Sequence, residues 1–325
     1  MKPTSLLVPS SLLLLSSNLF VSSFVIQLHT SSIIGVSAKS SSTGSSSRSS
    51  TRMLEKIYIV TGSTDGIGQH TASNLINTPD AKLLVHGRNP AKVAQTVQQL
   101  KSVNPGDIDG VVADLASFQD IRRLAKDLEE KIEAASPDAP VVLINNAGVF
   151  ETRRKESPEG LEMTFAINVA APFLLTGLLL PLLRRRKNSR IINISSISQG
   201  GSIPWDDLQL ALPGAYTDHR AYSLSKLCMA MLSMEQSSRF GSAEFPIVCC
   251  DPGTVNTKML EAGWGMYGVD VSAANDETLL ALAPSLDNGS YFVGRMARKA
   301  NAEAYDPKSR ARLWQYLEEV TGFAY

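Results

Sequence analysis

The chain has 325 residues, of which 43% are hydrophobic and 19% are charged, and its 31 basic and 31 acidic side chains leave no formal net charge. This composition is that of a soluble globular protein large enough to bury a substantial core, and it gives no reason to expect a nucleic-acid partner. The three cysteines, Cys228, Cys249 and Cys250, have neither the number nor the spacing of a disulfide framework or a metal site.

Residues 1–52 differ in composition from the rest of the chain. They hold four basic residues and no acidic one, and an apolar run that includes four leucines at 12–15 precedes a serine-rich stretch. This pattern predicts a secretory signal or membrane anchor ahead of a folded domain at 53–325, with cleavage after Ser23 or Ala38. We expect an endomembrane (ER) location and membrane association through the N-terminus. A two-part plastid-targeting sequence is the alternative.

A short apolar run, 57–60, passes through the glycine-rich stretch 61–68 into a helical pattern. A strand, a glycine turn and a helix typically begin a dinucleotide-binding fold, because glycines let the backbone approach a pyrophosphate and the helix N-terminus supplies amide donors. The glycines follow the pattern Gly-x-x-x-Gly-x-Gly. The cofactor contacts predicted from this turn are Gly62, Ser63, Thr64, Gly66, Ile67 and Gly68.

The second predicted strand, 82–85, ends at the sequence His86-Gly87-Arg88-Asn89. An acidic side chain here would accept hydrogen bonds from the adenosine ribose of NAD, whereas an arginine binds the 2′-phosphate of NADP. The acid is missing and Arg88 is present, so we expect NADP(H) to be preferred over NAD(H). The alternative is that Arg88 is an ordinary solvated loop residue.

Strand and helix patterns continue to alternate, with further strands expected at 110–113, 141–144, 190–194 and 247–250. This alternation predicts an α/β fold with a single Rossmann-type, doubly wound parallel sheet flanked by helices. A final strand and helix are expected after residue 291. The carboxyl ends of the strands would form the ligand crevice. The residues that follow strands there are Asp114-Leu115, Asn145 to Gly148, Ser195-Ser196 and Pro252-Gly253.

Two helical stretches carry further predictions. The stretch 172–183 is apolar, but it is too short and too interrupted by Pro and Gly to span a membrane, so we interpret it as a core or subunit-interface helix. In the stretch 221–234, Tyr222 and Lys226 are four residues apart and share one face. An ammonium group beside a phenol lowers the pKa of the phenol, which makes the pair a candidate general acid/base. Taken alone, this spacing occurs on many helices.

Together these motifs resemble the short-chain dehydrogenase/reductase family over residues 55 to 320. The stretch 61–68, Asn145 to Gly148, Ser196, Tyr222-x-x-x-Lys226 and Pro252-Gly253 occur in that family's order and approximate spacing. Within the family, the long interval from Ser196 to Tyr222, the segment 206–208 and the pair Leu313-Trp314 resemble the retinol-dehydrogenase-like branch. The sequence 222–228 also resembles protochlorophyllide reductase, whose glycine turn fits less well.

The resemblance implies an NADP(H)-dependent oxidoreductase that acts on a carbonyl or an alcohol. Ser196 would bind the carbonyl oxygen, Tyr222 would act as the acid/base, and Lys226 would lower the pKa of Tyr222 and hold the nicotinamide ribose. Asn168 would anchor a water in a proton relay; a helix-kinking hydrogen bond is the alternative for Asn168. The other cofactor contacts implied are Asp114, Leu115, Asn146, Ala147, Gly148, Tyr222, Lys226, Pro252, Gly253, Val255 and Thr257. No metal is expected.

The substrate is expected to be a small hydrophobic molecule, such as a retinoid-like or polyprenoid aldehyde or ketone. The loop 259–267 is rich in apolar and aromatic residues and, with Phe150 and Trp205, predicts an apolar pocket. An NADPH-binding redox sensor or scaffold of the same fold is the alternative function. The resemblance also implies a homodimer formed through the helices at 172–183 and 221–234.

Overall fold

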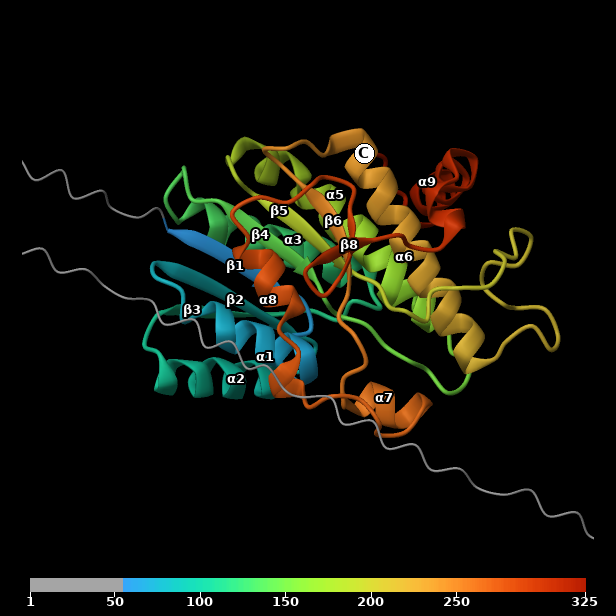
Figure 1. The fold of residues 1–325 in the computed structure, drawn as a ribbon, viewed down its shortest axis with the longest axis horizontal. Coiled ribbons are helices and arrows are strands. Elements are labelled where there is room, and N and C mark those ends of the chain that lie inside the picture. Colours follow the sequence, from blue (N-terminus) through green and yellow to red (C-terminus); the bar gives the residue numbers. More distant parts are fainter. Residues whose placement is uncertain (1–54) are drawn as a thin grey trace, which may run out of the picture. The chain divides into compact units, whose positions relative to one another are not determined.

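The computed structural model describes residues 55–325, so the predicted targeting segment and its cleavage sites lie outside the described residues. The described residues form one eight-stranded sheet with helices on both faces (Figure 1). The strands are β1 (Lys56–Val60), β2 (Ala81–Gly87), β3 (Asp107–Val112), β4 (Val141–Asn145), β5 (Arg190–Ile194), β6 (Ile247–Asp251), β7 (Tyr291–Val293) and β8 (Met296–Arg298). The α-helices are α1 (Gly66–Leu75), α2 (Pro90–Val103), α3 (Phe118–Glu133), α4 (Met163–Phe165), α5 (Ala171–Arg185), α6 (Asp218–Phe240), α7 (Lys258–Gly263), α8 (Asp276–Leu282) and α9 (Pro307–Thr321). A π-helical turn, η1 (Ala166–Ala170), and two 3-10 helices, η2 (Val271–Ala273) and η3 (Ala302–Tyr305), lie between them.

The strand order is β3-β2-β1-β4-β5-β6-β7-β8, and all neighbouring strands are parallel except β7 and β8. This order confirms the predicted Rossmann-type, doubly wound sheet. Strands β4, β5 and β6 are buried along their whole length, as expected where helices cover both faces of a parallel sheet. The antiparallel β8 was not predicted, because its three residues are exposed and form no apolar run.

Alternate residues of β1 divide between two separate apolar clusters. Ile57 and Ile59 belong to the cluster that includes residues of α3, α5, α6 and α9, whereas Tyr58 and Val60 belong to the cluster with α1, α2 and α8. Because side chains alternate along a strand, each face of the sheet packs against its own helix layer. The winding direction reverses between β1 and β4, so a ligand crevice is expected where the carboxyl ends of these strands separate.

The stretch Met163–Arg185, which runs from α4 through η1 to the end of α5, has 23 residues and could cross a membrane by length and composition alone. The expectation that this stretch is too short was wrong, because the helix begins at Met163, well before the apolar run at 172–183. Met163–Arg185 is the one such helix among the described residues, and 89% of its most apolar 18-residue window is buried within the fold. Burial by the protein itself accounts for its hydrophobicity. The stretch is therefore a core helix, one of the two interpretations expected from its sequence.

Candidate active site

The glycine turn between β1 and α1 has the shape of a phosphate cradle. Gly62 and Gly66 have φ values of 67° and 54°, a left-handed conformation that residues other than glycine rarely adopt. A Cβ atom on Gly68 would lie 2.3 Å from Nδ2 of Asn146 and 2.5 Å from the carbonyl oxygen of Gly62. Asn146 Nδ2 donates to the carbonyl of Thr61 at 2.7 Å, which ties the turn to the end of β4. Only glycine at these positions allows the turn to adopt this shape and to pack so closely against the end of β4.

His86, at the end of β2, forms a hydrogen bond with the glycine turn. Its Nδ1 accepts a hydrogen bond from the amide of Gly62 at 3.1 Å, and its Nε2 lies 3.2 Å from the carbonyl oxygen of Ala113. One ring nitrogen therefore accepts while the other donates, which is the pattern of a neutral imidazole. Burial lowers the pKa of His86 to about 4, consistent with a neutral ring at physiological pH. No role was expected for His86, because nothing in the local sequence distinguishes it from other residues at strand ends.

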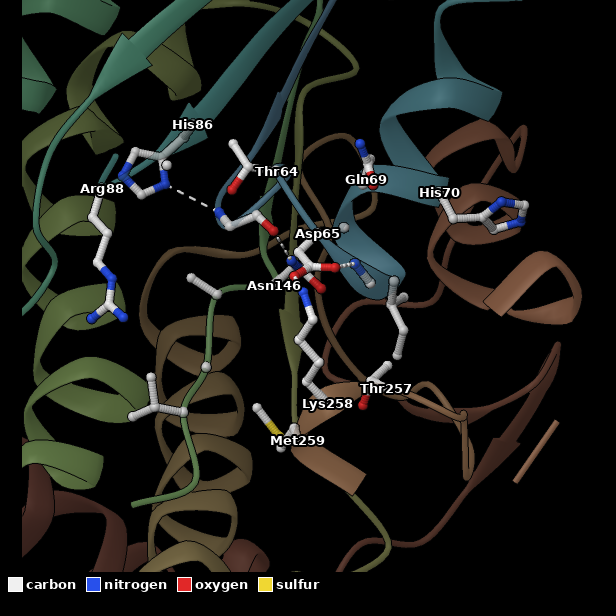
Figure 2. Close-up of a pocket in the computed structure, with 18 of the residues that line it drawn as sticks. Thr64, Asp65, Gln69, His70, His86, Arg88, Asn146, Thr257, Lys258 and Met259 are labelled. Carbon is white, nitrogen blue, oxygen red and sulfur yellow. Dashed lines mark hydrogen bonds and ion pairs between the residues drawn. The ribbon is translucent and has the colours of Figure 1, made fainter. Parts of the chain in front are cut away.

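A cleft of about 960 Å³ extends from the glycine turn along the carboxyl ends of β1, β2, β3 and β4 (Figure 2). It brings together most of the residues predicted to contact a cofactor. Those that line it are Gly62, Thr64, Gly66, Ile67, Gly68, Arg88, Asp114, Leu115, Asn146, Ala147, Gly148 and Thr257. Ser63 is not among them, because its side chain is fully buried and its hydroxyl oxygen accepts a hydrogen bond from the amide of His86.

The far end of the cleft is where the adenosine half of a dinucleotide would lie. Arg88 is exposed there and extends beside the cleft (Figure 2). A Cβ atom on Gly87 would lie 2.7 Å from Cγ2 of Thr64, so Gly87 makes room for the threonine side chain next to Arg88. One carboxylate oxygen of Asp114 accepts a hydrogen bond from the backbone amide of Ala116, within the same turn. The guanidinium of Arg88 and the hydroxyl of Thr64 are thus the groups that can bind a ligand at this end of the cleft.

A second, smaller cavity of about 120 Å³ adjoins the cleft and shares Ile67, Thr257 and Met259 with it. The other predicted residues that line it are Ser196, Tyr222, Lys226, Pro252, Gly253 and Val255. Ser195, by contrast, is buried and donates its hydroxyl proton to the carbonyl oxygen of Lys226 at 2.7 Å. Of the two neighbouring serines, Ser196 is therefore the one that faces the cavity.

Tyr222 and Lys226 lie on successive turns of α6, which begins at the side-chain cap of Thr217. The Lys226 ammonium lies 5.6 Å from the centre of the Tyr222 ring and donates to the carbonyl oxygen of Ile194 at 3.0 Å. Burial raises the pKa of Tyr222 to about 12, and a hydrogen bond with Ser196 acts in the opposite direction. Burial lowers the pKa of Lys226 to about 8. At neutral pH the phenol is protonated beside a charged lysine, an arrangement that can deliver a proton.

Lys226 was expected to lower the pKa of Tyr222, but in the structure burial has the larger effect and raises this pKa. Desolvation dominates because Tyr222 is only 7% exposed, and Lys226 is not among the groups that shift its pKa. A phenol with a raised pKa is still more acidic than an alcohol, so it remains a competent proton donor to an alkoxide. The degree of burial of Tyr222 could not be predicted from the sequence.

Asn168 is buried inside the π-helical turn η1. Its Oδ1 accepts from the amide of Val149 at 2.8 Å, and its Nδ2 donates to the carbonyl oxygen of Val149 and to Oγ of Ser225. These bonds tie the loop after β4 to α6. The alternative for Asn168 was a helix-kinking hydrogen bond, but its side-chain bonds go to Val149 and Ser225 and not to the backbone of its own helix.

Two aromatic rings pack against Tyr222. The centres of the Phe150 and Trp264 rings lie 5.7 and 5.4 Å from that of Tyr222, and 4.9 Å from each other. Both residues were predicted near an apolar pocket, and Trp264 lines the smaller cavity. Trp205 lines neither cavity; it lies under the guanidinium of Arg312, 4.7 Å from its centre.

Two residues that the sequence analysis did not single out bridge the mouth of the cleft. Asp65 accepts a hydrogen bond from the amide of Gly66 at the start of α1, and it forms an ion pair with Lys258 at the start of α7 (Figure 2). The pair links the glycine turn to the loop that carries Trp264. No cluster of three or more potential metal ligands occurs among residues 55–325.

The chain is similar to known oxidoreductases over most of its length. The family model for short chain dehydrogenases matches residues 56–266. Polyprenol dehydrogenase from Homo sapiens is 30% identical over 292 residues, covering 82% of this chain and 86% of that protein. Retinol dehydrogenase 13 from Mus musculus is 30% identical over 289 residues, with coverage of 83% and 84%. The NADPH-bound carbonyl reductase from chicken fatty liver has a TM-score of 0.58 at 25% identity, covering 76% of this chain and all of that one.

Proposed function

The chain belongs to the short-chain dehydrogenase family, in its retinol-dehydrogenase-like branch, and on that basis we propose that it is an NADPH-dependent oxidoreductase that interconverts a carbonyl and an alcohol. One observation carries the proposal. Ser196, Tyr222 and Lys226 line a single cavity that adjoins a cleft shaped for a dinucleotide. The folded catalytic domain is proposed to span 53–325.

The cleft fits a nicotinamide dinucleotide. The glycine turn would hold the pyrophosphate with backbone amides at the start of α1. At the other end, a Cβ atom on Gly148 would lie 3.3 Å from Oδ1 of Asn168 and 3.5 Å from Nζ of Lys226, so the missing side chain leaves room beside the ammonium. When bound, the nicotinamide supplies or accepts the hydride.

Two residues of the chain, Ser196 and Tyr222, would bind and protonate the oxygen of the substrate. The Ser196 hydroxyl is placed to donate a hydrogen bond to a carbonyl oxygen in the smaller cavity, and Tyr222 is placed to transfer its phenolic proton to the same oxygen. The hydrogen bond with Ser196 stabilises the phenolate that remains, and the nearby Lys226 ammonium is proposed to hold the nicotinamide ribose. In the direction of alcohol oxidation, the phenolate accepts the proton instead.

NADPH is proposed over NADH because of the residues at the adenosine end of the cleft. Arg88 supplies a charge for a 2′-phosphate, and Thr64 lies against Gly87 next to it. A hydrophobic substrate is proposed because Leu260, Trp264 and Tyr267 line the smaller cavity. The names of the relatives, polyprenol and retinol dehydrogenases, refer to hydrophobic alcohols. An ER location, carried by residues 1–52, would suit such a substrate.

A panel of hydrophobic aldehydes and ketones, incubated with the purified full chain and NADPH, tests this function. Oxidation of NADPH, followed at its absorbance band, should depend on the carbonyl, and the product should be the corresponding alcohol. Binding of NADPH without turnover of any carbonyl would contradict the enzymatic function and favour the redox sensor or scaffold.

A further inference from the structure

The glycine turn carries an acidic side chain at the place where an anionic cofactor would bind. Asp65 is the N-cap of α1, and its Oδ1 accepts a hydrogen bond from the amide of Gly66 at 2.9 Å. Amides at the start of a helix are the donors that hold a phosphate, and the helix dipole favours an anion there. The carboxylate of Asp65 already uses one of these donors, and its charge repels a pyrophosphate. An acid at this position weakens cofactor binding unless a nearby cation compensates for it.

Lys258, at the start of α7, is that cation. Its ammonium forms an ion pair with Oδ2 of Asp65, and both residues line the cleft (Figure 2). The hydrogen bond between the two side chains lowers the pKa of Asp65 and raises that of Lys258, so both groups are charged at neutral pH. The two oxygens of one carboxylate thus join the Gly66 amide to the Lys258 ammonium. These two donors converge on a single anion.

The backbone places the start of α7 beside the glycine turn independently of this ion pair. Thr257 caps α7 by accepting a hydrogen bond from the amide of Leu260 at 3.2 Å. A Cβ atom on Gly66 would lie 3.4 Å from Cγ2 of Thr257, so the cap of α7 lies next to the start of α1. The Lys258 side chain is 78% exposed and has a flexible four-carbon stem. Its ammonium can therefore change partners by rotation of the side chain alone.

We propose that Lys258 binds the pyrophosphate of the cofactor, and that Asp65 keeps the lysine beside the site while the cofactor is absent. A phosphate at the start of α1 has the Gly66 amide and the ammonium within reach, the same two donors that the carboxylate uses. The ammonium exchanges a weak, exposed ion pair for a charge-assisted hydrogen bond to phosphate. This role rests on the proposed function, because it requires a dinucleotide in the cleft. It differs from the role of Arg88, which concerns the 2′-phosphate alone.

Equilibrium binding of NADPH and NADH to the full chain, measured by fluorescence titration, tests this role. Lys258→Met keeps the apolar stem and removes the charge. Its Kd should rise roughly tenfold for both cofactors, because both contain the pyrophosphate and a hydrogen bond to a charged group contributes about this much. Asp65→Asn keeps an acceptor for the Gly66 amide and removes the repulsion, so its Kd should fall. A higher Kd for Asp65→Asn would contradict the exchange.

The double variant separates direct binding from simple neutralisation of Asp65. If Lys258 binds the phosphate, adding Lys258→Met to Asp65→Asn should raise the Kd by roughly tenfold or more, because no ion pair is given up in this background. If Lys258 only neutralises Asp65, there is no charge left to neutralise, and the double variant should bind as Asp65→Asn does. That second result, or an unchanged Kd for Lys258→Met alone, would overturn the proposal.

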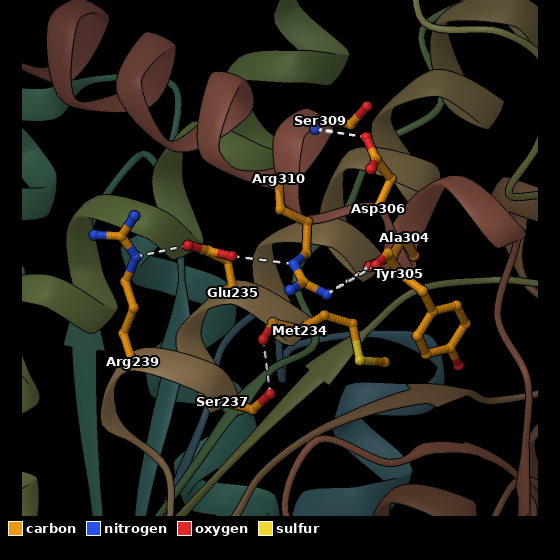
Figure 3. Close-up of polar contacts among 9 residues, drawn as sticks. All are labelled: Met234, Glu235, Ser237, Arg239, Ala304, Tyr305, Asp306, Ser309 and Arg310. Atoms are coloured by element: carbon orange, nitrogen blue, oxygen red, sulfur yellow. Dashed lines mark hydrogen bonds and ion pairs between the residues drawn. The ribbon is translucent and has the colours of Figure 1, made fainter.

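The start of α9 offers a matched control that lines neither cavity. Asp306 caps this helix by accepting a hydrogen bond from the amide of Ser309 at 2.8 Å (Figure 3), and Lys308 in the first turn is exposed. Asp306→Asn and Lys308→Met make the same charge changes there and should leave both Kd values unchanged. Thermal melting verifies that each variant is folded. A wild-type chain that binds neither cofactor would overturn the proposed function, whereas binding that is insensitive to Lys258→Met would overturn this inference alone.

Discussion

At the scale of single residues, the proposed preference for NADPH over NADH depends on Arg88. Its guanidinium is exposed beside the cleft, where it can bind a phosphate without first breaking another ion pair in the described structure. Arg88→Asp replaces attraction by repulsion, so the KM for NADPH should rise roughly 10- to 100-fold while that for NADH changes little. Steady-state kinetics with both cofactors measure this. Arg298→Asp makes the same charge change on β8 and serves as the control; equal effects of Arg88→Asp on NADPH and NADH would contradict the assignment.

His86 is expected to influence cofactor affinity through the shape of the glycine turn. His86→Phe keeps a ring in the buried site but removes the acceptor for Gly62 and the donor to Ala113. Loss of buried hydrogen-bond partners costs about 1–3 kcal/mol each. We expect a lower melting temperature and roughly tenfold weaker NADPH binding, measured by fluorescence titration. Unchanged affinity would show that the turn keeps its shape without the histidine.

At the scale of elements, α8 holds a buried acid that should make stability depend on pH. Glu277 is fully buried; one carboxylate oxygen accepts from Thr71 of α1 and the other has no hydrogen-bond partner in the described structure. Burial raises the pKa of Glu277 from 4.5 to about 7, although Thr71 and Lys226 oppose this shift and Asp276 adds to it. The native state therefore binds this proton more tightly than the unfolded chain does.

The sign of the effect follows from that difference in pKa. The contribution of Glu277 to stability is present below about pH 4.5 and is lost as pH rises through about 7, a change of roughly 3 kcal/mol. Glu277→Gln should therefore raise the free energy of unfolding at pH 8 much more than at pH 5, as measured by denaturant titration. Glu261→Gln, on the exposed side of α7, is the control. A gain of equal size at both pH values would contradict this account.

The loop that carries α7 is closed at its base by hydrogen bonds and contacts the rest of the site near its tip. Val269 donates its amide proton to the carbonyl oxygen of Thr254, and the Asn256 side chain bonds both backbone groups of Gly268, which closes the base of the loop. Its tip contacts the rest of the site through the Asp65–Lys258 ion pair and the Phe150–Trp264 rings. Both side chains of this ion pair are more than half exposed, so the pair contributes little free energy to the position of the loop.

At the scale of the whole molecule, the sheet and the grouping of Ser196, Tyr222 and Lys226 at one cavity were predictable because their signals are local. The strand before each glycine or serine motif is a short apolar run, and the spacing of Tyr222 and Lys226 fits one turn of a helix. The predicted NADP preference is equally local, because Arg88 directly follows its strand. These features need no knowledge of distant contacts.

Other features depend on residues that are far apart in the sequence. His86 meets Gly62 across 24 residues, and Tyr325 meets Phe173 across 152 residues. Trp205 was expected at the pocket on composition alone, but the distant Arg312 lies over its ring. The pKa of Tyr222 likewise depends on how α6 and the aromatic rings exclude water, which no pattern in the helix encodes.

The proton transfer assigned to Tyr222 is tested most directly by Tyr222→Phe in the full chain, with Tyr305→Phe as a control at an exposed tyrosine. The phenylalanine keeps the ring that packs against Phe150 and Trp264 and removes only the proton donor. The account predicts that carbonyl-dependent NADPH oxidation falls by about 10²-fold or more, while NADPH binding stays within a few-fold of the wild type. Turnover by Tyr222→Phe at the wild-type rate, on a carbonyl that the wild type reduces, would contradict it.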